Sequence, residues 1–263
     1  IVKSYTMEEK RMVRAIMHGC NGKMGQVVTR LAEEEQQIEI VAGIDTQKVE
    51  QNPYPIFETL RECNVEADVV IDFSNAAAVD ELLAVCVEKQ LPVVLCTTGL
   101  SEEQLHKTEE AAEKVAVLRS ANMSLGINLL MKLLQSAAAV LSPAGFDIEI
   151  VEKHHNQKLD APSGTAIALA DSMNEALEQA YTYTYDRSKE RKKREKQEIG
   201  ISAVRGGTIV GEHEVIFAGT DEVIELKHTA YSKTVFGKGA IEAAKYLAGK
   251  PAGRYDMSDV IQL

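Results

Sequence analysis

Short apolar runs alternate with helical stretches from residue 12 to residue 119, and this alternation constrains the fold more than any other feature. Runs too short for helices predict buried parallel strands at 13–18, 38–44, 69–73, 92–96 and 115–118. Apolar residues at helical spacing predict helices at 24–34, 76–89 and 101–114. Ser101 and Gln104 fit a capping box at the start of the last helix. This order is typical of an α/β fold with a doubly wound, Rossmann-like parallel sheet.

The first predicted strand runs into the sequence HGCNGKMG, with glycines at positions 19, 22 and 25. This spacing is a variant of the dinucleotide-binding fingerprint, whose early glycines let a pyrophosphate approach the backbone and whose last lets helix and strand pack closely. A glycine-rich turn in an unrelated α/β domain could share the motif. Asp45 strengthens it, because an acid about twenty residues later, at the end of the second strand, can bind the adenine ribose. We therefore expect a dinucleotide site.

Two more loops follow predicted strand ends, where open α/β sheets bind ligands. One has the sequence DFSNAAA at 72–78, and the other has CTTG at 96–99. Their hydroxyls and turn backbone are suited to contact the nicotinamide half of a dinucleotide. Taken alone, either loop is better explained by ordinary turn chemistry.

A dense polar cluster lies between residues 152 and 166, in the sequence EKHHNQKLDAPSGTA. The alternating residues before it, at 146–152, predict a half-buried strand, and the apolar spacing after it predicts a helix. We therefore expect the cluster on a strand-to-helix loop that regular structure holds on both sides. Loops on a rigid scaffold often carry chemistry.

The residues of this loop suit a ligand with carboxylates. Ser163 fits an N-cap, and the N–H groups around Gly164 and Thr165 would then form an anion site at the helix start. Lys158 adds a positive charge, which Asp160 would partly neutralise. The two adjacent histidines can each donate a hydrogen bond or move a proton near neutral pH. A surface loop with a good helix cap is the alternative for any one of these residues, but it does not explain the whole cluster.

The rest of the sequence predicts a second, α+β domain. An apolar helix at 126–141 is expected to link the domains, and a helix at 236–248 to return to the first one. A four-stranded, mixed or mostly antiparallel sheet is predicted from strands at 146–152, 200–205, 212–218 and 223–230. The basic run RSKERKKREK at 187–196 contains two glutamates, which favours a solvated loop or helix end over a nucleic-acid patch.

The composition limits the possible partners. The chain has 263 residues and a net charge of −11, which argues against general binding of nucleic acids or membrane surfaces, since both are anionic. Apolar runs fall short of the roughly 18–20 residues of a membrane span. The cysteines at 20, 63, 86 and 96 form no CxxC pair, so reduced thiols in a cytoplasmic protein are expected. No metal site is expected, because adjacent histidines on extended backbone point in opposite directions.

The chain resembles the dihydrodipicolinate reductases of bacterial lysine and diaminopimelate biosynthesis. The resemblance runs from residue 12 nearly to the end and rests on GCNGKMG, DFSN, CTTG, SANMSLGIN, EKHHNQKLDAPSGTA, VRGGTIVGEHEV at 204–215 and YDMSDV. It implies a Rossmann domain closed by the C-terminal helix, and a substrate domain whose sheets build a homotetramer. The expected division is a tail at 1–11, a dinucleotide-binding domain at 12–121 completed by 237–263, and a substrate-binding and tetramerisation domain at 122–236.

The resemblance also implies a role for each motif. The cofactor would be held by Gly19, Cys20, Asn21, Gly22, Lys23, Met24, Asp45, Cys96, Thr97, Thr98, Ser120, Ala121, Asn122 and Met123. His154 would be the catalytic acid or base, and Lys158 a second proton donor or charge anchor. His155, Gly164 and Thr165 would bind a cyclic dicarboxylate. The family uses NADH or NADPH to reduce hydroxy-tetrahydrodipicolinate to tetrahydrodipicolinate with loss of water.

Two positions depart from the family pattern. Position 96 is cysteine where the family often has glycine. Position 46 is threonine where some members carry an arginine suited to a ribose 2′-phosphate, so we expect NADH to be preferred.

Two rival functions explain less of the sequence. Another Rossmann dehydrogenase, acting on a different small amino or hydroxy acid, would account for the first half but not for DAPSGTA. A non-catalytic dinucleotide sensor that binds partners through the basic run would bind NADH tightly without turnover.

Overall fold

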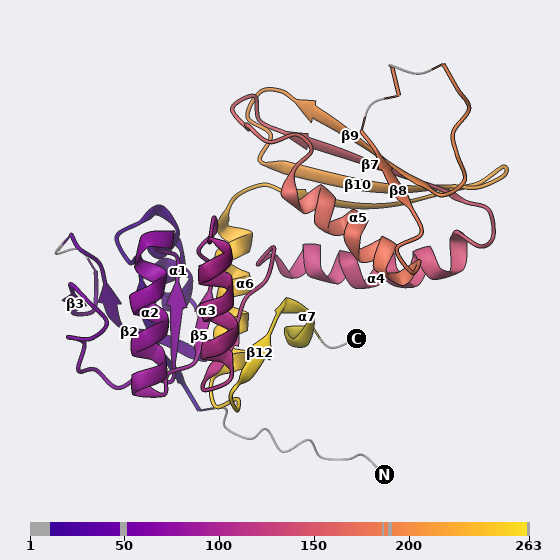
Figure 1. The fold of residues 1–263 in the computed structure, drawn as a ribbon. Helices are drawn as coiled ribbons and strands as arrows, with labels where there is room; N and C mark the ends of the chain where they lie inside the picture. The colour runs from indigo at the N-terminus through magenta and orange to yellow at the C-terminus, as the bar shows by residue number, and fades with distance from the viewer. Residues whose placement is uncertain (1–10, 48–51, 186, 189–190, 262–263) are drawn as a thin grey trace, which may run out of the picture. The chain divides into compact units, whose positions relative to one another are not determined.

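The computed structural model describes residues 11–47, 52–185, 187–188 and 191–261, so the expected N-terminal tail lies outside the described residues except for Arg11. The chain divides into two compact units (Figure 1). One unit comprises the residues up to 123 together with 236–262, and the other comprises residues 124–235.

The first unit contains a parallel sheet in the strand order β12-β6-β5-β4-β1-β2-β3. Its strands are β1 (Val13–His18), β2 (Ile38–Ile44), β3 (Ile56–Phe57), β4 (Val69–Asp72), β5 (Val93–Leu95), β6 (Ala116–Leu118) and β12 (Gly253–Tyr255). The doubly wound parallel sheet is confirmed. The sequence analysis missed β3 and β12, which have two and three residues and are too short for a periodic pattern.

Five helices belong to this unit. They are α1 (Lys23–Glu33), α2 (Ala76–Lys89), α3 (Glu102–Ala112), α6 (Thr234–Leu247) and α7 (Met257–Val260). The predicted capping box is present: Ser101 accepts a hydrogen bond from the N–H of Gln104, whose side chain accepts one from the N–H of Ser101. Asn75 caps α2 in a similar way, by accepting from the N–H of Ala77.

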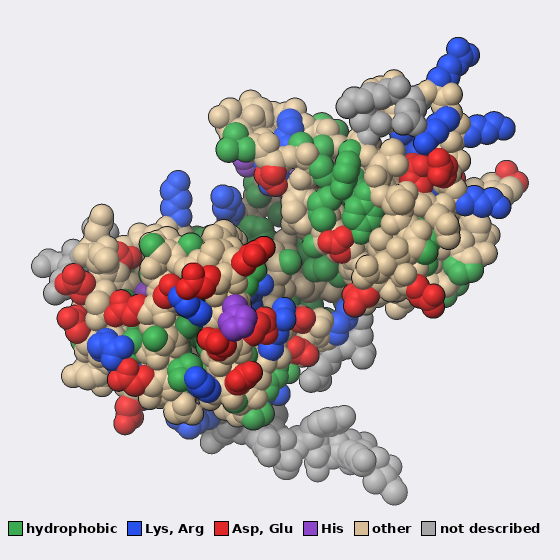
Figure 2. All heavy atoms as spheres, in the orientation of Figure 1, with side chains coloured by type: hydrophobic (Ala, Val, Ile, Leu, Met, Phe, Trp, Pro, Cys, Tyr) green, Lys and Arg blue, Asp and Glu red, His purple; other side chains and the backbone are tan. Residues whose placement is uncertain are grey.

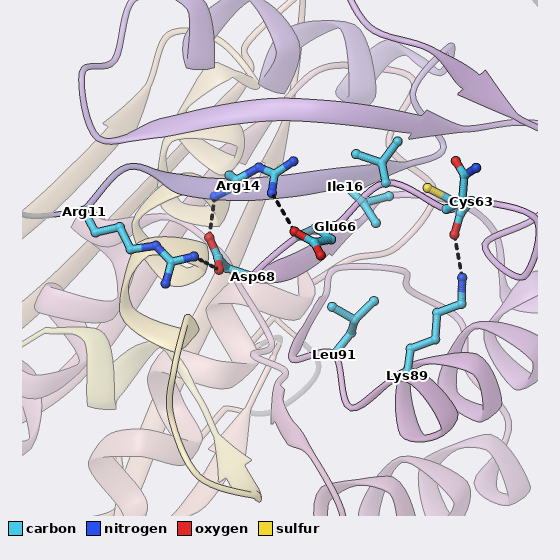
Figure 3. Close-up of a pocket in the computed structure, with 11 residues that line it drawn as sticks. Arg11, Arg14, Ile16, Cys63, Glu66, Asp68, Lys89 and Leu91 are labelled. Carbon is cyan, nitrogen blue, oxygen red and sulfur yellow. Dashed lines mark hydrogen bonds and ion pairs between the residues drawn. The ribbon is translucent and has the colours of Figure 1, made fainter.

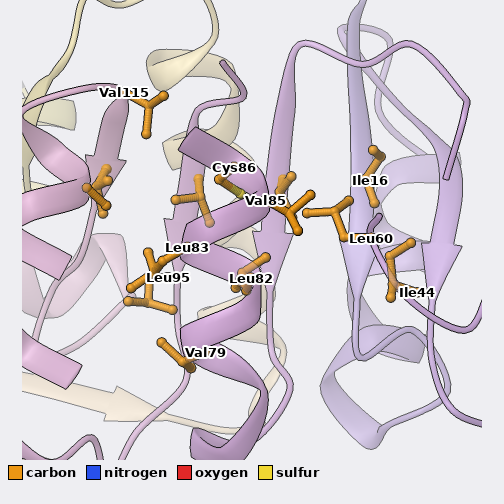
Figure 4. Packing of buried hydrophobic residues seen from close by; sticks show 14 of the residues in the cluster. Ile16, Ile44, Leu60, Val79, Leu82, Leu83, Val85, Cys86, Leu95 and Val115 are labelled. Atoms are coloured by element: carbon orange, nitrogen blue, oxygen red, sulfur yellow. The ribbon is translucent and has the colours of Figure 1, made fainter. Parts of the chain in front are cut away.

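An apolar cluster fills the space between the sheet and α2 (Figure 4). The strands β4 and β5 are buried along their whole length, as expected for central strands of a parallel sheet. The cluster includes Ile16, Ile44, Leu60, Val79, Leu82, Leu83, Val85, Cys86, Leu95 and Val115. This core fixes the carboxyl ends of the strands, and therefore the loops that follow them.

The second unit contains a mixed sheet in the order β11-β10-β7-β9-β8. Its strands are β7 (Asp147–His154), β8 (Thr182–Thr184), β9 (Glu198–Arg205), β10 (Gly211–Ala218) and β11 (Val223–Ala230). β10 runs antiparallel to β7 and β11, whereas β9 runs parallel to β7 and β8. The mixed sheet is confirmed, but the predicted number of strands is wrong, because β8 is too short to show an alternation.

Two helices, α4 (Leu125–Leu141) and α5 (Gly164–Ala176), share a core with one face of this sheet. Leu134 from α4, Leu169 from α5 and Phe217 from β10 are each fully buried in it. Side chains of β7 alternate between half-buried and buried positions, which fixes the direction of every residue up to His154.

Of the described residues in the basic run at 187–196, none lies in a helix or strand and all but Arg194 are exposed, so the solvated loop is confirmed. Arg194 lies 2.9 Å from the carboxylate of Asp147 and 3.0 Å from that of Glu149. Arg187 pairs with Glu149 and with the buried Glu198. From this loop the two arginines neutralise acidic side chains of β7 and β9.

Figure 2 shows acidic side chains spread over the visible face of the first unit, in keeping with the net charge of −11. Within the described ranges, no helix is both long enough and apolar enough to span a membrane.

Candidate active site

The glycine turn between β1 and α1 has the geometry that its fingerprint requires. Gly19 has φ +81°, and a Cβ there would lie 2.8 Å from the carbonyl oxygen of Phe73. A Cβ on Gly25 would lie 2.2 Å from the carbonyl oxygen of Gly19, so α1 can approach the turn only with glycine at this position. Gly22 is exposed, which leaves the backbone of the turn open to a ligand.

Asp45 directly follows β2 and connects it to the glycine turn. Its carboxylate accepts hydrogen bonds from the N–H of Asn21 at 3.0 Å and from that of Gln47 at 3.1 Å. Asp45 lines one cavity together with His18, Gly19, Gly22, Ile44, Thr46, Glu58, Thr59, Leu60, Phe73, Ser74, Asn75, Ala78, Glu81 and Leu82. Neither Glu58 nor Glu81 was predicted, because neither belongs to a motif and only the fold brings them to this cavity.

The other residues of the turn differ in exposure. Cys20 is fully buried, and burial raises the pKa of its thiol to about 11, with a further contribution from Asp45. Its side chain therefore faces the protein interior, and only its backbone is open to a cofactor. Lys23 is exposed and Met24 half-buried at the start of α1.

The loops DFSN and CTTG meet at the carboxyl ends of β4 and β5. The N–H of Cys96 donates to the carbonyl of Asp72 at 3.0 Å, and the hydroxyls of Ser74 and Thr97 lie 3.5 Å apart. Thr97 is buried, whereas Thr98 is exposed. The structure thus brings the two loops together, although Cys96, Thr97 and Thr98 do not line the cavity of Asp45.

Residues 120–123 follow β6 and also lie outside the lining of that cavity. Ser120 and Asn122 are half-buried, and Ala121 is exposed. Met123 is buried against α6, where a Cβ on Gly239 would lie 1.6 Å from the carbonyl oxygen of Met123. α6 therefore packs directly against the backbone of this segment.

His154 is the last residue of β7 and is buried, with 8% of its surface exposed. The expectation that it lies on a polar loop is wrong, because the strand continues two residues beyond the predicted end. Its Nδ1 lies 2.6 Å from Oε2 of Glu152, which precedes it on the same face of the strand. A histidine and a carboxylate thus share the buried and otherwise apolar face of the strand.

Glu152 is fully buried and receives four hydrogen bonds. Arg205, which faces His154 across β7 and β9, donates from Nη1 and Nη2 to its two oxygens, each at 2.7 Å. The N–H of Ser163 adds a bond of 2.9 Å. Burial opposes ionisation of Glu152, but Arg205, His154 and Ser163 outweigh burial and lower its pKa. Because an ionised carboxylate only accepts, Nδ1 of His154 carries the proton in this bond, and Nε2 remains for chemistry.

His213 on β10 lies edge-on to the ring of His154, with 5.1 Å between the ring centroids. Burial, with the charge of His154 as a second cause, lowers its pKa to about 4. His213 is therefore neutral at neutral pH, and its Nε2 lies 3.0 Å from the hydroxyl of Ser163. His213, Glu152 and Arg205 were not predicted as site residues, although all three lie in the quoted sequences EKHH and VRGGTIVGEHEV.

The loop after β7 carries the other predicted residues. Lys158 lies 2.8 Å from the carboxylate of Asp160, and this contact is the main cause of the lowered pKa of Asp160. Ser163 caps α5 as predicted, by accepting from the N–H of Ala166 at 3.1 Å. Gly164 is exposed, and a Cβ there would meet no atom within 4 Å.

His155 and Thr165 flank this loop, and both are half-buried. Among the residues that the structure describes, no group of three or more His, Cys, Asp and Glu side chains could hold a metal ion.

The first unit is a nucleotide-binding Rossmann domain, and the second presents a buried histidine beside a lysine-bearing loop and a helix start, so together they define a Rossmann-type oxidoreductase. Residues 13–123 match the dihydrodipicolinate reductase N-terminus, and residues 126–261 match the dihydrodipicolinate reductase C-terminus. The chain belongs to the dihydrodipicolinate reductase family.

Named relatives cover almost the whole chain. It is 53% identical over 251 residues to the 4-hydroxy-tetrahydrodipicolinate reductase of Caldanaerobacter subterraneus subsp. tengcongensis, covering 95% of this chain and 99% of that one. The reductase of the same name from Clostridium tetani is 49% identical, with coverage of 95% and 98%. A solved structure of dipicolinate-bound dihydrodipicolinate reductase from Paenisporosarcina sp. TG-14 matches with a TM-score of 0.80 and 26% identity, covering 95% of this chain and 100% of that one.

Proposed function

We propose that this chain reduces 4-hydroxy-tetrahydrodipicolinate to tetrahydrodipicolinate and water with NADH or NADPH, in lysine and diaminopimelate biosynthesis. The observation that carries the proposal is the fixed hydrogen bond between Glu152 and His154, beside the loop that holds Lys158 and the start of α5. Family membership and the named relatives give the substrate.

The glycine turn and Asp45 fit the adenosine and pyrophosphate parts of the cofactor. The pyrophosphate would approach the backbone of the turn at Gly22, and the ribose hydroxyls of the cofactor would donate to Asp45. We assign the nicotinamide side to Cys96, Thr97 and Thr98 with the segment 120–123. The bound dinucleotide supplies a hydride.

Carboxylates around Asp45 support NADH as the preferred cofactor. Glu58 and Glu81 line the same cavity, and Thr46 brings no positive charge. A ribose 2′-phosphate would face three acidic side chains there, and like charges at short range repel. Lys23 is exposed outside the lining, and Lys48, two residues after Thr46 in the sequence, lies outside the described residues.

His154 is assigned as the proton donor to the substrate. Hydride addition to a conjugated imine leaves electrons on the ring, so an acid must supply a proton. The bond from Nδ1 to Glu152 fixes the ring and leaves Nε2 to deliver that proton. Arg205 helps to keep Glu152 ionised, so Glu152 remains the acceptor for the Nδ1–H of His154 while Nε2 gives up its proton.

Positive charge and backbone donors at the start of α5 fit the two substrate carboxylates. We assign Lys158, His155, Gly164 and Thr165 to this role. Lys158 has a carboxylate partner in Asp160, which is exposed and can move away. A substrate carboxylate would replace that of Asp160 at Lys158, so the lysine keeps a partner in both states.

We assign residues 12–121 with 237–263 to cofactor binding, residues 122–236 to substrate binding and assembly, and the active form to a homotetramer in the cytoplasm. The mixed sheet supports this assembly, because one face lacks a helix and carries exposed apolar side chains at Val204 and Val223. Analytical ultracentrifugation of the full chain checks it: a monomer at micromolar concentration would contradict the assignment.

An assay with coupled synthesis of the substrate, run with NADH and NADPH in parallel, tests the function. Oxidation of the cofactor that depends on the cyclic substrate supports it. A dinucleotide sensor would instead bind NADH and show no turnover. Another dehydrogenase would turn over a different acid, and it would be insensitive to pyridine-2,6-dicarboxylate.

A further inference from the structure

His18 and Asp72 form a hydrogen-bonded pair at the carboxyl ends of β1 and β4, directly before the glycine turn. Nδ1 of His18 lies 2.7 Å from Oδ1 of Asp72, which also accepts from the N–H of Ser74 at 3.1 Å. Asp72 is fully buried. Burial opposes its ionisation, but the hydrogen bond and charge of His18, with further hydrogen bonds from Ser74 and Thr97, outweigh burial and lower the pKa of Asp72. Asp72 is therefore a carboxylate, and Nδ1 of His18 is the donor.

The carboxylate of Asp72 can accept more hydrogen bonds than the described residues donate to it. Its second oxygen, Oδ2, is buried and has no hydrogen-bond partner among them. A buried carboxylate of this kind stabilises a positive charge on the ring that it contacts. The bond to Asp72 occupies Nδ1 of His18, so Nε2 is the ring nitrogen that remains for a ligand.

His18 lines the cavity that Asp45 and the glycine turn share. Three carboxylate side chains, those of Asp45, Glu58 and Glu81, line this cavity as well. Among the described lining residues, only His18 has a side chain that can carry a positive charge. A dinucleotide brings two negative charges on its pyrophosphate into these acidic surroundings, so positive charge beside the turn would favour binding.

A second cavity of the first unit offers no alternative anion site. It lies at the amino ends of β1, β4 and β5, and Figure 3 shows its cations already engaged. Arg11 lies 3.1 Å from Asp68, and Lys89 donates to the carbonyl of Cys63 at 2.6 Å.

We propose that His18, positioned and charged by Asp72, binds the pyrophosphate of the cofactor. The proposal rests on the proposed function, since it assumes that the cavity holds a dinucleotide. The contact needs the protonated ring, because Nδ1 already donates to Asp72 and only an imidazolium has a second N–H, so affinity for the dinucleotide should fall as the pH rises. The other titratable groups that contact His18 or line its cavity in the described residues are the carboxyl groups of Asp72, Asp45, Glu58 and Glu81.

The test measures dissociation constants for NADH by fluorescence titration without substrate, at pH 6.5 and pH 8.5. His18→Gln keeps an N–H donor but loses the charge, so we expect binding at pH 6.5 to weaken by about tenfold. The variant should also lose the pH dependence of the wild type. His106→Gln is the matched control, because His106 lies on α3 with an exposed side chain, outside the cavity. It should keep the wild-type affinity and its pH dependence.

A measurement on the wild type alone covers the case in which His18→Gln does not fold. ADP-ribose contains the pyrophosphate and adenosine lacks it, so weakening from pH 6.5 to pH 8.5 is expected for ADP-ribose only. Equal pH dependence for both ligands, or a variant that keeps the wild-type pH dependence, overturns the proposal. If the wild type turns over the substrate and the His18→Gln variant binds NADH as tightly as the wild type, this inference alone is overturned. If the wild type does not bind NADH, the proposed function is overturned as well.

Discussion

At the scale of single residues, His154 and Lys158 have the same expected effect on turnover but different effects on folding. His154→Ala removes a buried hydrogen bond to Glu152 and leaves that carboxylate with one partner fewer, at a cost of about 1–3 kcal/mol. Lys158→Ala affects a loop residue whose partner is exposed, so thermal stability should change little. Both variants should lower kcat, by about 10²-fold or more for the proton donor. Circular dichroism melts and steady-state kinetics check this, and near-wild-type turnover in both variants would remove them from the mechanism.

Glu152→Gln tests whether the carboxylate positions His154 and supports its charge. The amide retains hydrogen-bonding capacity but leaves Arg205 without its buried counter-charge and removes support for the imidazolium. We expect a large loss of kcat, an altered pH profile and an NADH dissociation constant close to wild type. An unchanged pH profile would mean that Glu152 serves the fold only.

Single residues also determine the preference for NADH over NADPH. NADH should give a higher kcat/KM than NADPH, because Asp45 accepts from ribose hydroxyls but repels a 2′-phosphate. Asp45→Asn removes the repulsion and Thr46→Arg supplies a bidentate cation, so each should narrow the preference. Parallel kinetics with the two cofactors give the ratio. A wild-type enzyme that clearly favours NADPH would show that lysines near the site outweigh the acids.

At the scale of elements, the start of α5 is expected to hold a substrate carboxylate. Pyridine-2,6-dicarboxylate should then compete with the substrate. Gly164→Val should raise its inhibition constant several-fold, because a side chain would cover backbone that is open at this position. The NADH dissociation constant serves as the control for folding. An inhibition constant that does not respond to Gly164 would place the carboxylate elsewhere.

Elements with a full periodic pattern were predictable from the sequence, and short ones were not. β1, β2 and α2 coincide with their predicted ranges over their whole length, because each spans enough residues to show its spacing. β3, β8 and β12 have two or three residues and were missed. The error at the end of β7 has a different cause: Glu152 and His154 are polar residues on a buried face, where an apolar pattern stops before the strand does.

The same limit applies to the site. Motif residues such as Gly19, Asp45 and Ser163 could be assigned because each performs a backbone or capping task that sequence spacing reveals. Arg205 and His213, which complete the surroundings of Glu152 and His154, come from β9 and β10, more than fifty residues along the chain, and only the strand pairing brings them there.

At the scale of the whole molecule, buried charge should make stability depend on pH. The pKa of His213 is about 4 in the folded chain, mainly because of burial, below the ordinary value of 6.5 for histidine. Between these values the unfolded chain binds a proton that the folded chain does not, so the contribution of His213 is fully present above pH 6.5 and is lost as the pH falls toward 4. The lowered pKa of Glu152 acts in the same direction at still lower pH, since its ionised form is the one that the fold stabilises.

We therefore expect the melting temperature to fall steadily between pH 7 and pH 4. His213→Gln should flatten the upper part of that fall, because glutamine takes up no proton on unfolding, even if the variant is less stable at pH 7. His106→Gln, which changes an exposed histidine, is the control and should follow the wild-type curve. Thermal melts in matched buffers at constant ionic strength measure the three curves. A His213→Gln curve parallel to the wild type from pH 6.5 to pH 4 would show that the acid sensitivity arises elsewhere in the chain.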